Sequence, residues 1–116
     1  MIIFALIFLG PLALSADKLA DAKGAGGESR AALVIGNTAY PSGALANPKN
    51  DATAVASALK KMGFDVELKL NASKTDIDSM LSRFSLKADK AGVAMVFYAG
   101  HGIQVGGINY IVPIDA

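Results

Sequence analysis

The chain has 116 residues, enough for one domain with a single hydrophobic core. Lysine and arginine together number 11, against 10 aspartates and glutamates. Because the basic residues are scattered, the dense positive surface that nucleic acid requires is missing, and we do not expect nucleic acid as a partner. The sequence contains no cysteine, which excludes disulfides, thiolate zinc sites and a thiol nucleophile within these 116 residues.

The N-terminal segment has an apolar run from Ile2 to Leu14. This run is shorter than the roughly 20 residues that span a bilayer, and Gly10-Pro11 interrupts it, so we expect no stable membrane span. Small residues follow, with cleavage expected after Ser15 or Ala16, although the segment before the run has no lysine or arginine. We interpret residues 1–16 as an export signal and expect a periplasmic or extracellular protein. An uncleaved anchor or a wrongly assigned start codon is the alternative.

Residues 17–30 are rich in alanine, glycine and charged side chains without any sustained period, which is typical of a flexible linker. The domain is therefore expected over residues 31–116. It begins with the apolar run AALVIG, residues 31–36, which predicts a strand covered on both faces.

A helix is expected next, with Asn50 or Asp51 as its N-cap and Gly63 where it stops. Its apolar positions recur at spacings of three and four: Ala52, Val55, Ala56, Leu59 and Met62. The segment from Phe64 to Leu70 then alternates apolar and charged residues, which predicts a strand near the outside of a sheet.

Ser73 and Asp76 resemble a capping box and predict the start of a second helix, although Glu or Gln is the usual third residue after the cap. The apolar stretch AGVAMVFYAG, residues 91–100, predicts the most buried strand. After it, GIQV and INYIV flank Gly106-Gly107, a dipeptide suited to the tight turn of a β-hairpin. Alternation of strands and helices predicts an α/β fold, with a mostly parallel sheet, helices on its faces and a C-terminal hairpin.

His101 is the only histidine of the chain and follows the most buried predicted strand. In open parallel sheets, ligands bind beyond the carboxyl ends of the strands, and an imidazole titrates near neutral pH. His101 is therefore a candidate for proton transfer, and the backbone amide of Gly102 could donate to an oxyanion. A hydrogen-bonded turn histidine is the alternative interpretation.

Neither a nucleotide site nor a metal site is expected. The pattern Gly100-x-Gly102 lacks the third glycine of a dinucleotide loop, because Val105 occupies that place, and a strand rather than a helix follows. One histidine and scattered carboxylates, such as Asp76 and Asp78, form no compact set of metal ligands. We therefore expect no cofactor.

Four stretches of the sequence together resemble the large-subunit part of the caspase and metacaspase superfamily, particularly the bacterial caspase-like peptidases. They are RAALVIGNTAY, LANPKNDATAVASALKKMGFDV, VFYAGHG and GINYIVPIDA, within residues 30–116. The resemblance implies a Rossmann-like three-layer sandwich and a cysteine-type endopeptidase activity on peptides or proteins. It also implies that His101 belongs to a His–Cys dyad and that the amide of Gly102 helps to hold the oxyanion.

Asp51 matches an acidic position that in metacaspases helps to form the pocket for the residue before the cleaved bond. This match implies substrates with Arg or Lys at that position. Residues 37–50 contain no arginine that could pair with a substrate aspartate. A purely structural role for Asp51 in the first helical turn is an equal alternative. Ala99 and Pro48 depart from the serine and the cysteine found at these places in metacaspases, so the details of the pocket are not transferred.

The nucleophilic cysteine of the family is missing. In caspases it follows the histidine by about 50 residues, whereas 15 residues follow His101 here. We therefore expect an incomplete peptidase domain, the histidine-bearing half, which is inactive alone and needs a missing cysteine-bearing segment or subunit. A catalytically dead pseudo-peptidase that serves as an interaction module is the main alternative. An α/β domain that binds a small ligand is a third possibility.

Overall fold

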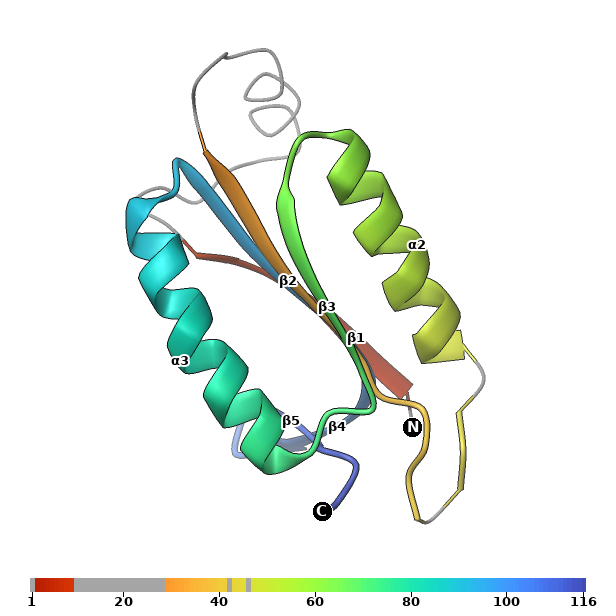
Figure 1. Ribbon diagram of the computed structural model, residues 1–116. Coiled ribbons are helices and arrows are strands. Elements are labelled where there is room, and N and C mark those ends of the chain that lie inside the picture. Colours follow the sequence, from red (N-terminus) through yellow and green to blue (C-terminus); the bar gives the residue numbers. More distant parts are fainter. Residues whose placement is uncertain (1, 10–28, 42, 46) are drawn as a thin grey trace.

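The structure, a computed structural model, describes residues 2–9, 29–41, 43–45 and 47–116. Strands and helices follow each other along the chain as Figure 1 shows. Their bounds are β1 (Ile2–Leu9), β2 (Arg30–Gly36), α2 (Asn47–Lys61), β3 (Asp65–Leu70), α3 (Lys74–Lys90), β4 (Val93–Val105) and β5 (Ile108–Ile111). The predicted alternation of strands and helices after residue 30 is confirmed.

The strands form one mixed sheet in the order β1-β4-β2-β3, and β5 pairs with β4 outside this path. Strand β2 runs parallel to both β3 and β4, whereas β1 and β5 are antiparallel to β4. Helices α2 and α3 cover opposite faces of the sheet (Figure 1). The molecule is therefore a three-layer α/β sandwich with a mostly parallel centre and a C-terminal hairpin, as predicted, and β3 is an edge strand.

The core consists of two apolar layers, one on each face of β2. Side chains alternate between the two faces of a strand, so Val34 faces α2 whereas Leu33 and Ile35 face α3. All three side chains are at most 1% exposed. Burial of each such side chain contributes about 1.5–3 kcal/mol. The continuous apolar run that predicted a strand covered on both faces thus has a helix over each face.

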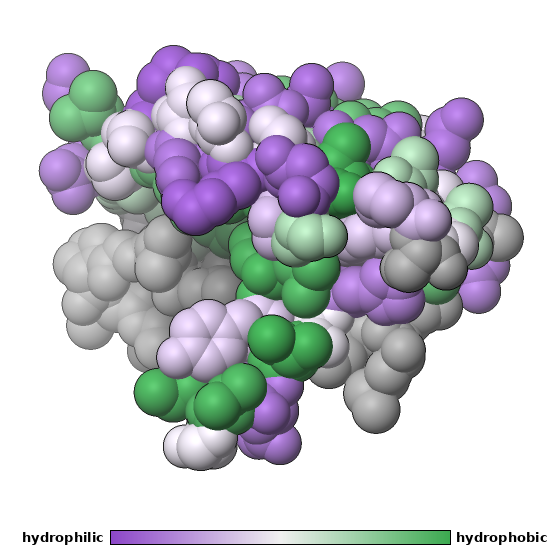
Figure 2. Space-filling model, turned by 90° about the horizontal axis from the view of Figure 1, so that it is seen from below, coloured by the Kyte–Doolittle hydropathy of each residue, from purple (hydrophilic) through white to green (hydrophobic). Residues whose placement is uncertain are grey.

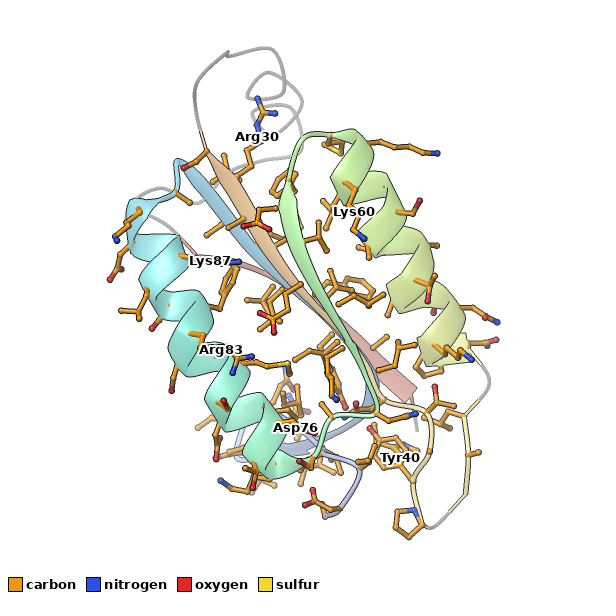
Figure 3. All side chains as sticks on the ribbon, in the orientation of Figure 1. Arg30, Tyr40, Lys60, Asp76, Arg83 and Lys87 are labelled. Atoms are coloured by element: carbon orange, nitrogen blue, oxygen red, sulfur yellow. The ribbon has the colours of Figure 1, made fainter. Side chains whose placement is uncertain are left out.

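Ion pairs join the outer side of β3 to α3. Arg83 contacts Glu67 at 3.0 Å, and Lys87 contacts Asp65 at 3.1 Å. Figure 3 shows Arg83 and Lys87 projecting from α3 near β3. All four side chains are substantially exposed, so each pair contributes about 1 kcal/mol or less. These pairs account for the charged residues that alternate along β3, but they contribute little to the stability of the fold.

A predicted helix cap and a predicted hairpin turn are confirmed. Ser73 caps α3 through a complete capping box with Asp76. Gly106 and Gly107 both have positive φ angles, 58° and 81°, which the two central residues of a type I′ hairpin turn require.

Two predicted boundaries are wrong. Helix α2 begins at Asn47, so neither Asn50 nor Asp51 caps it. Pro48 fits this earlier start, because the first turn of a helix does not use the backbone N–H that proline lacks. Strand β4 continues to Val105 and passes through His101, which was expected to follow the strand, because β5 pairs with this extension.

The N-terminal apolar run contains a strand that the sequence analysis did not predict. Residues Ile2–Leu9 form β1, paired along the edge of β4 from Ile2 opposite His101 to Leu9 opposite Ala94. The expected cleavage positions after Ser15 or Ala16, and nearly all of the expected linker, lie outside the described residues. Within the part of the chain that the structure describes, no helix is long and apolar enough to cross a membrane.

Candidate active site

His101 lies where β4 changes its neighbour. As far as Ala99, this edge of β4 pairs with β2, and the amide of Asn37 still donates to the Ala99 carbonyl at 2.8 Å. From Gly102 onward the same edge pairs with β5. The sheet thus opens at His101, beyond the carboxyl end of β2, which is the position where open α/β sheets bind ligands.

Two tyrosine hydroxyls hold the main chain of His101. The His101 amide donates to Oη of Tyr40 at 2.9 Å, and Oη of Tyr98 donates to the His101 carbonyl at 2.6 Å. The amide of Val112 also donates to this carbonyl, at 3.0 Å. The imidazole packs against the Tyr40 ring, with 4.4 Å between the ring centroids and an interplanar angle of 54°. Both the backbone and the side chain of His101 are therefore fixed by neighbouring groups.

The carbonyl of Val112 connects these groups to the core. It accepts from Oη of Tyr40 at 2.9 Å and from Nδ2 of Asn37 at 3.4 Å, and it lies 3.1 Å from Oη of Tyr98. Asn37 is fully buried, and its Oδ1 accepts from the Ala72 amide at 2.7 Å. The segment after β5 is therefore bound to the loops that follow β2 and β3.

Burial raises the pKa of the Tyr98 hydroxyl above its ordinary value, and the hydrogen bond with Tyr40 adds to this shift. The hydroxyl therefore stays protonated well into the alkaline range. It remains a donor to the His101 carbonyl throughout the range in which an imidazole transfers protons.

A pocket of about 380 Å³ opens beside His101. Its lining comes from the loop after β2, from β4 and from the segment after β5: Tyr40, Pro41, His101, Gly102, Ile103, Val112 and Ala116. Tyr40 is labelled in Figure 3, at the end of the sheet where this pocket lies. Successive amides of an extended strand point to opposite edges, so the Gly102 amide is directed away from the β5 side, opposite to that of His101. His101 and Gly102 thus both line the pocket, whereas the Gly102 amide points to the opposite edge of β4, the edge that pairs with β1 as far as His101.

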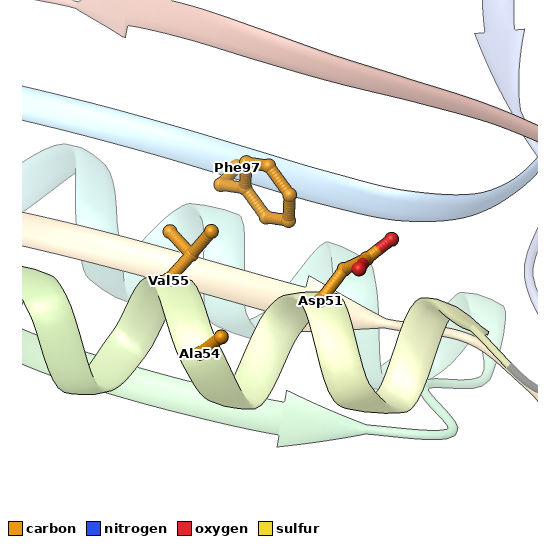
Figure 4. A pocket seen from close by; sticks show the side chains of 4 residues that line it. All are labelled: Asp51, Ala54, Val55 and Phe97. Atoms are coloured by element: carbon orange, nitrogen blue, oxygen red, sulfur yellow. The ribbon is translucent and has the colours of Figure 1, made fainter.

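Asp51 lines a different pocket, of about 320 Å³, between α2 and β4. Its other lining residues are Ala54, Val55 and Phe97, and the Asp51 carboxylate points from the helix toward the strand (Figure 4). Phe97 and His101 lie on the same side of β4, because strand side chains alternate. Four residues along a strand span about 13 Å. The pocket of Asp51 thus reaches β4 four residues before His101, and neither of the two pockets is lined by both residues.

The described residues contain no cluster of three or more histidine, cysteine, aspartate or glutamate side chains that could hold a metal ion. Among the described residues that line these two pockets, Asp51 has the one acidic side chain. The His101 pocket presents an imidazole and backbone groups that can form hydrogen bonds.

Comparison with known protein families matches residues 29–116 to the caspase domain. This match covers most of the chain, including both pockets. The chain belongs to the caspase-domain family.

Two curated relatives agree with this assignment. They are the mucosa-associated lymphoid tissue lymphoma translocation protein 1 of Homo sapiens and its homologue of Mus musculus. Each is 30% identical to the chain over 90 residues, which are 77% of this chain. The matched part is 11% of the length of each relative, so the chain spans a small part of those proteins.

Sequence reasoning proposed His101, Gly102 and Asp51, and it missed the groups that hold His101 in place. Tyr40 and Asn37 come from the loop after β2, and Val112 contributes only its backbone. The sequence signal was the polar stretch N-T-A-Y directly after an apolar strand, since buried polar side chains at a strand end need hydrogen-bond partners. The role of the Val112 carbonyl could not be predicted from the sequence, because every residue has a carbonyl group.

Proposed function

We propose that this chain is the histidine-bearing part of a caspase-like cysteine endopeptidase. A cysteine thiolate supplied by another segment or subunit attacks the carbonyl carbon of the scissile peptide bond. His101 then passes a proton to the leaving amine, and the Gly102 amide stabilises the oxyanion. The observation that carries this proposal is the position of His101, fixed beside an open pocket in a chain that matches the caspase domain.

The substrate is a protein or peptide with Arg or Lys before the cleaved bond. The pocket of Asp51 supports this preference, because an apolar lining with one carboxylate suits a long aliphatic stem that ends in a cation. This carboxylate lies in the second turn of α2 and does not cap the helix. This position inside the helix, where no cap is needed, supports a role in substrate binding.

A second candidate function is that of a pseudo-peptidase that binds a partner without cleaving it. The sequence has no cysteine. In addition, apolar side chains of the β4–β5 hairpin are exposed: Ile103, Val105, Ile108, Tyr110 and Ile111. Figure 2 views the molecule from the end at which this hairpin lies and shows apolar side chains gathered there. Exposed apolar surface of this kind is typical of interaction sites.

We also propose that the protein is exported and that residues 1–16 are removed. The support is the short apolar run followed by small residues. Removal would take away β1 and expose the edge of β4 that β1 covers. Mass spectrometry of the expressed protein tests this proposal, and an intact Met1 in the purified protein contradicts it.

Complementation tests the peptidase proposal. The chain is assayed alone and together with the cysteine-bearing segment of a caspase-domain relative, fused after Ala116 or added as a second polypeptide. Fluorogenic peptides ending in Arg, Lys or Asp are the substrates. We expect hydrolysis after Arg and Lys only when both parts are present, and Asp51→Ala should weaken this preference. Stable binding of the two parts without hydrolysis would favour the pseudo-peptidase.

A further inference from the structure

The backbone rung between His101 and Val112 is irregular. The hairpin register pairs Gly102 with Ile111, so the next rung joins His101 to Val112. In a regular antiparallel rung of the hydrogen-bonded kind, the two residues exchange two N–H···O=C bonds. Only one of these bonds is direct here, from the Val112 amide to the His101 carbonyl at 3.0 Å.

The second bond of this rung runs through the hydroxyl of Tyr40. The His101 amide donates to Oη of Tyr40 at 2.9 Å, and the same hydroxyl donates to the Val112 carbonyl, also at 2.9 Å. One side-chain hydroxyl thus stands between a donor and an acceptor that would otherwise meet directly. Its insertion replaces a direct bond on this side of the rung.

The inserted hydroxyl lies beside a second buried hydroxyl. Oη of Tyr40 is 2.9 Å from Oη of Tyr98, whose single proton goes to the His101 carbonyl. Both tyrosines are buried, at 8% and 2% exposure, so water does not compete strongly for these hydrogen bonds. The ring that carries the inserted hydroxyl also packs against the imidazole of His101.

We infer that Tyr40 is a positioning residue for the catalytic group: its hydroxyl, inserted into the His101–Val112 rung, sets the place of His101 and of the Gly102 amide. This inference rests on the proposed function. Tyr40 acts only through its neighbours, because its hydroxyl is engaged both as acceptor and as donor. Without the hydroxyl, the His101 amide can bond directly to the Val112 carbonyl, and the rung closes toward the hairpin.

The first test uses the full chain and nuclear magnetic resonance. His101 is the only histidine, so one imidazole gives all the histidine ring signals. Tyr40→Phe removes the hydroxyl and keeps the ring, and Tyr110→Phe, at an exposed position of β5, is the matched control. We expect the amide signals of His101 and Gly102 and the imidazole signals to shift in Tyr40→Phe alone. Unshifted signals would overturn the inference, and Tyr98→Phe provides a second variant should Tyr40→Phe fail to fold.

The second test measures kcat and KM separately in the complemented enzyme. We expect Tyr40→Phe to lower kcat by about ten- to a hundredfold, the scale of a displacement of roughly 1 Å at a catalytic group, with KM nearly unchanged. Tyr110→Phe should match the unsubstituted enzyme. An active unsubstituted enzyme with equally active Tyr40→Phe overturns the positioning role alone. A complemented enzyme without any turnover contradicts the proposed function instead, and the resonance shifts then decide whether Tyr40 positions His101.

Discussion

The His101 amide and the Tyr40 hydroxyl lie 2.9 Å apart, although 61 positions separate the two residues in the sequence. This contact makes the loop after β2 a part of the candidate site. The segment after β5 contacts the loop between β3 and α3 as well. The Ile114 amide donates to the Ala72 carbonyl at 3.1 Å, and the Asp115 carboxylate accepts from the Lys74 amide at 2.9 Å. The surroundings of His101 are thus assembled from three loops that meet at one end of the sheet.

Gly100→Ala should disturb the tyrosine pair. A Cβ atom at this position would lie 2.5 Å from Oη of Tyr98 and 2.7 Å from Oη of Tyr40, so the tyrosines must shift. Overpacking of this kind costs about 1–3 kcal/mol. Urea unfolding should show this loss, and the double variant Gly100→Ala/Tyr98→Phe should lose less than the sum of the single variants. Additive losses would show that the close contact is relieved elsewhere.

The raised pKa of Tyr98 predicts a loss of stability at alkaline pH. In the unfolded chain the hydroxyl ionises near pH 10, whereas in the folded chain burial raises its pKa above that value. Its contribution is complete below about pH 10 and declines as the pH rises toward the folded pKa. The urea midpoint should therefore fall less between neutral and alkaline pH in Tyr98→Phe than in the unsubstituted chain. Equal slopes for both proteins would contradict the prediction.

Ser73→Ala should destabilise α3. The Asp76 amide donates to Oγ of Ser73 at 3.1 Å, and the loss of an N-cap costs about 1 kcal/mol. Ser57→Ala, at an exposed position inside α2, is the control and should change little. Thermal unfolding at neutral pH compares the two variants, and equal stabilities would show that the Ser73 cap contributes nothing.

The capping box of Ser73 and Asp76 also makes the free energy of unfolding depend on pH in the acidic range. Hydrogen bonds from the backbone and then from the side chain of Ser73 lower the pKa of the Asp76 carboxyl. The stabilisation is present above the ordinary aspartate pKa, near about 4, and is lost as the pH falls through the lower folded value. Since Ser73→Ala removes one of these hydrogen bonds, its stability should fall less on acidification than that of the unsubstituted chain. Unfolding midpoints between neutral and acidic pH measure this difference, and parallel curves would contradict it.

The exposed hairpin should cause self-association. Ile103, Val105 and Ile108 are 54%, 60% and 57% exposed on adjacent strands, whereas Leu86 on α3 is 66% exposed. Because contiguous apolar surface favours association more than an isolated side chain does, Ile103→Lys/Ile108→Glu should shift the chain toward monomer. Leu86→Lys is the control. Sedimentation at increasing concentration measures the effect, and a monomeric unsubstituted chain would contradict the prediction.

Much of the fold could be predicted because its signals are local. The apolar run at residues 31–36, the Ser73 cap and Gly106-Gly107 each specify a backbone conformation through nearby residues. The start of α2 was misplaced because two polar residues, Asn50 and Asp51, follow Pro48 and resemble a cap themselves. The pairing of Ile2–Leu9 with β4 could not be predicted, because a short apolar run suits an export signal as well as a buried strand.

Residues of the candidate site could be predicted only where the residue type itself indicates a chemical role. A single histidine between two glycines is conspicuous, whereas Tyr40 acquires its role from a contact with a distant strand. The end of β4 was misplaced for a related reason. The strand extends past His101 because β5 pairs with it, and pairing depends on both strands.

The most direct test of the central claim is the turnover of the complemented enzyme with and without the imidazole of His101. We expect the unsubstituted chain with its cysteine-bearing segment to cleave fluorogenic peptides after Arg or Lys. His101→Ala should lower this turnover at least about a hundredfold, the usual scale for the loss of a general acid–base group. Full activity of His101→Ala, or cleavage by the chain without a cysteine-bearing segment, would contradict the role assigned to His101.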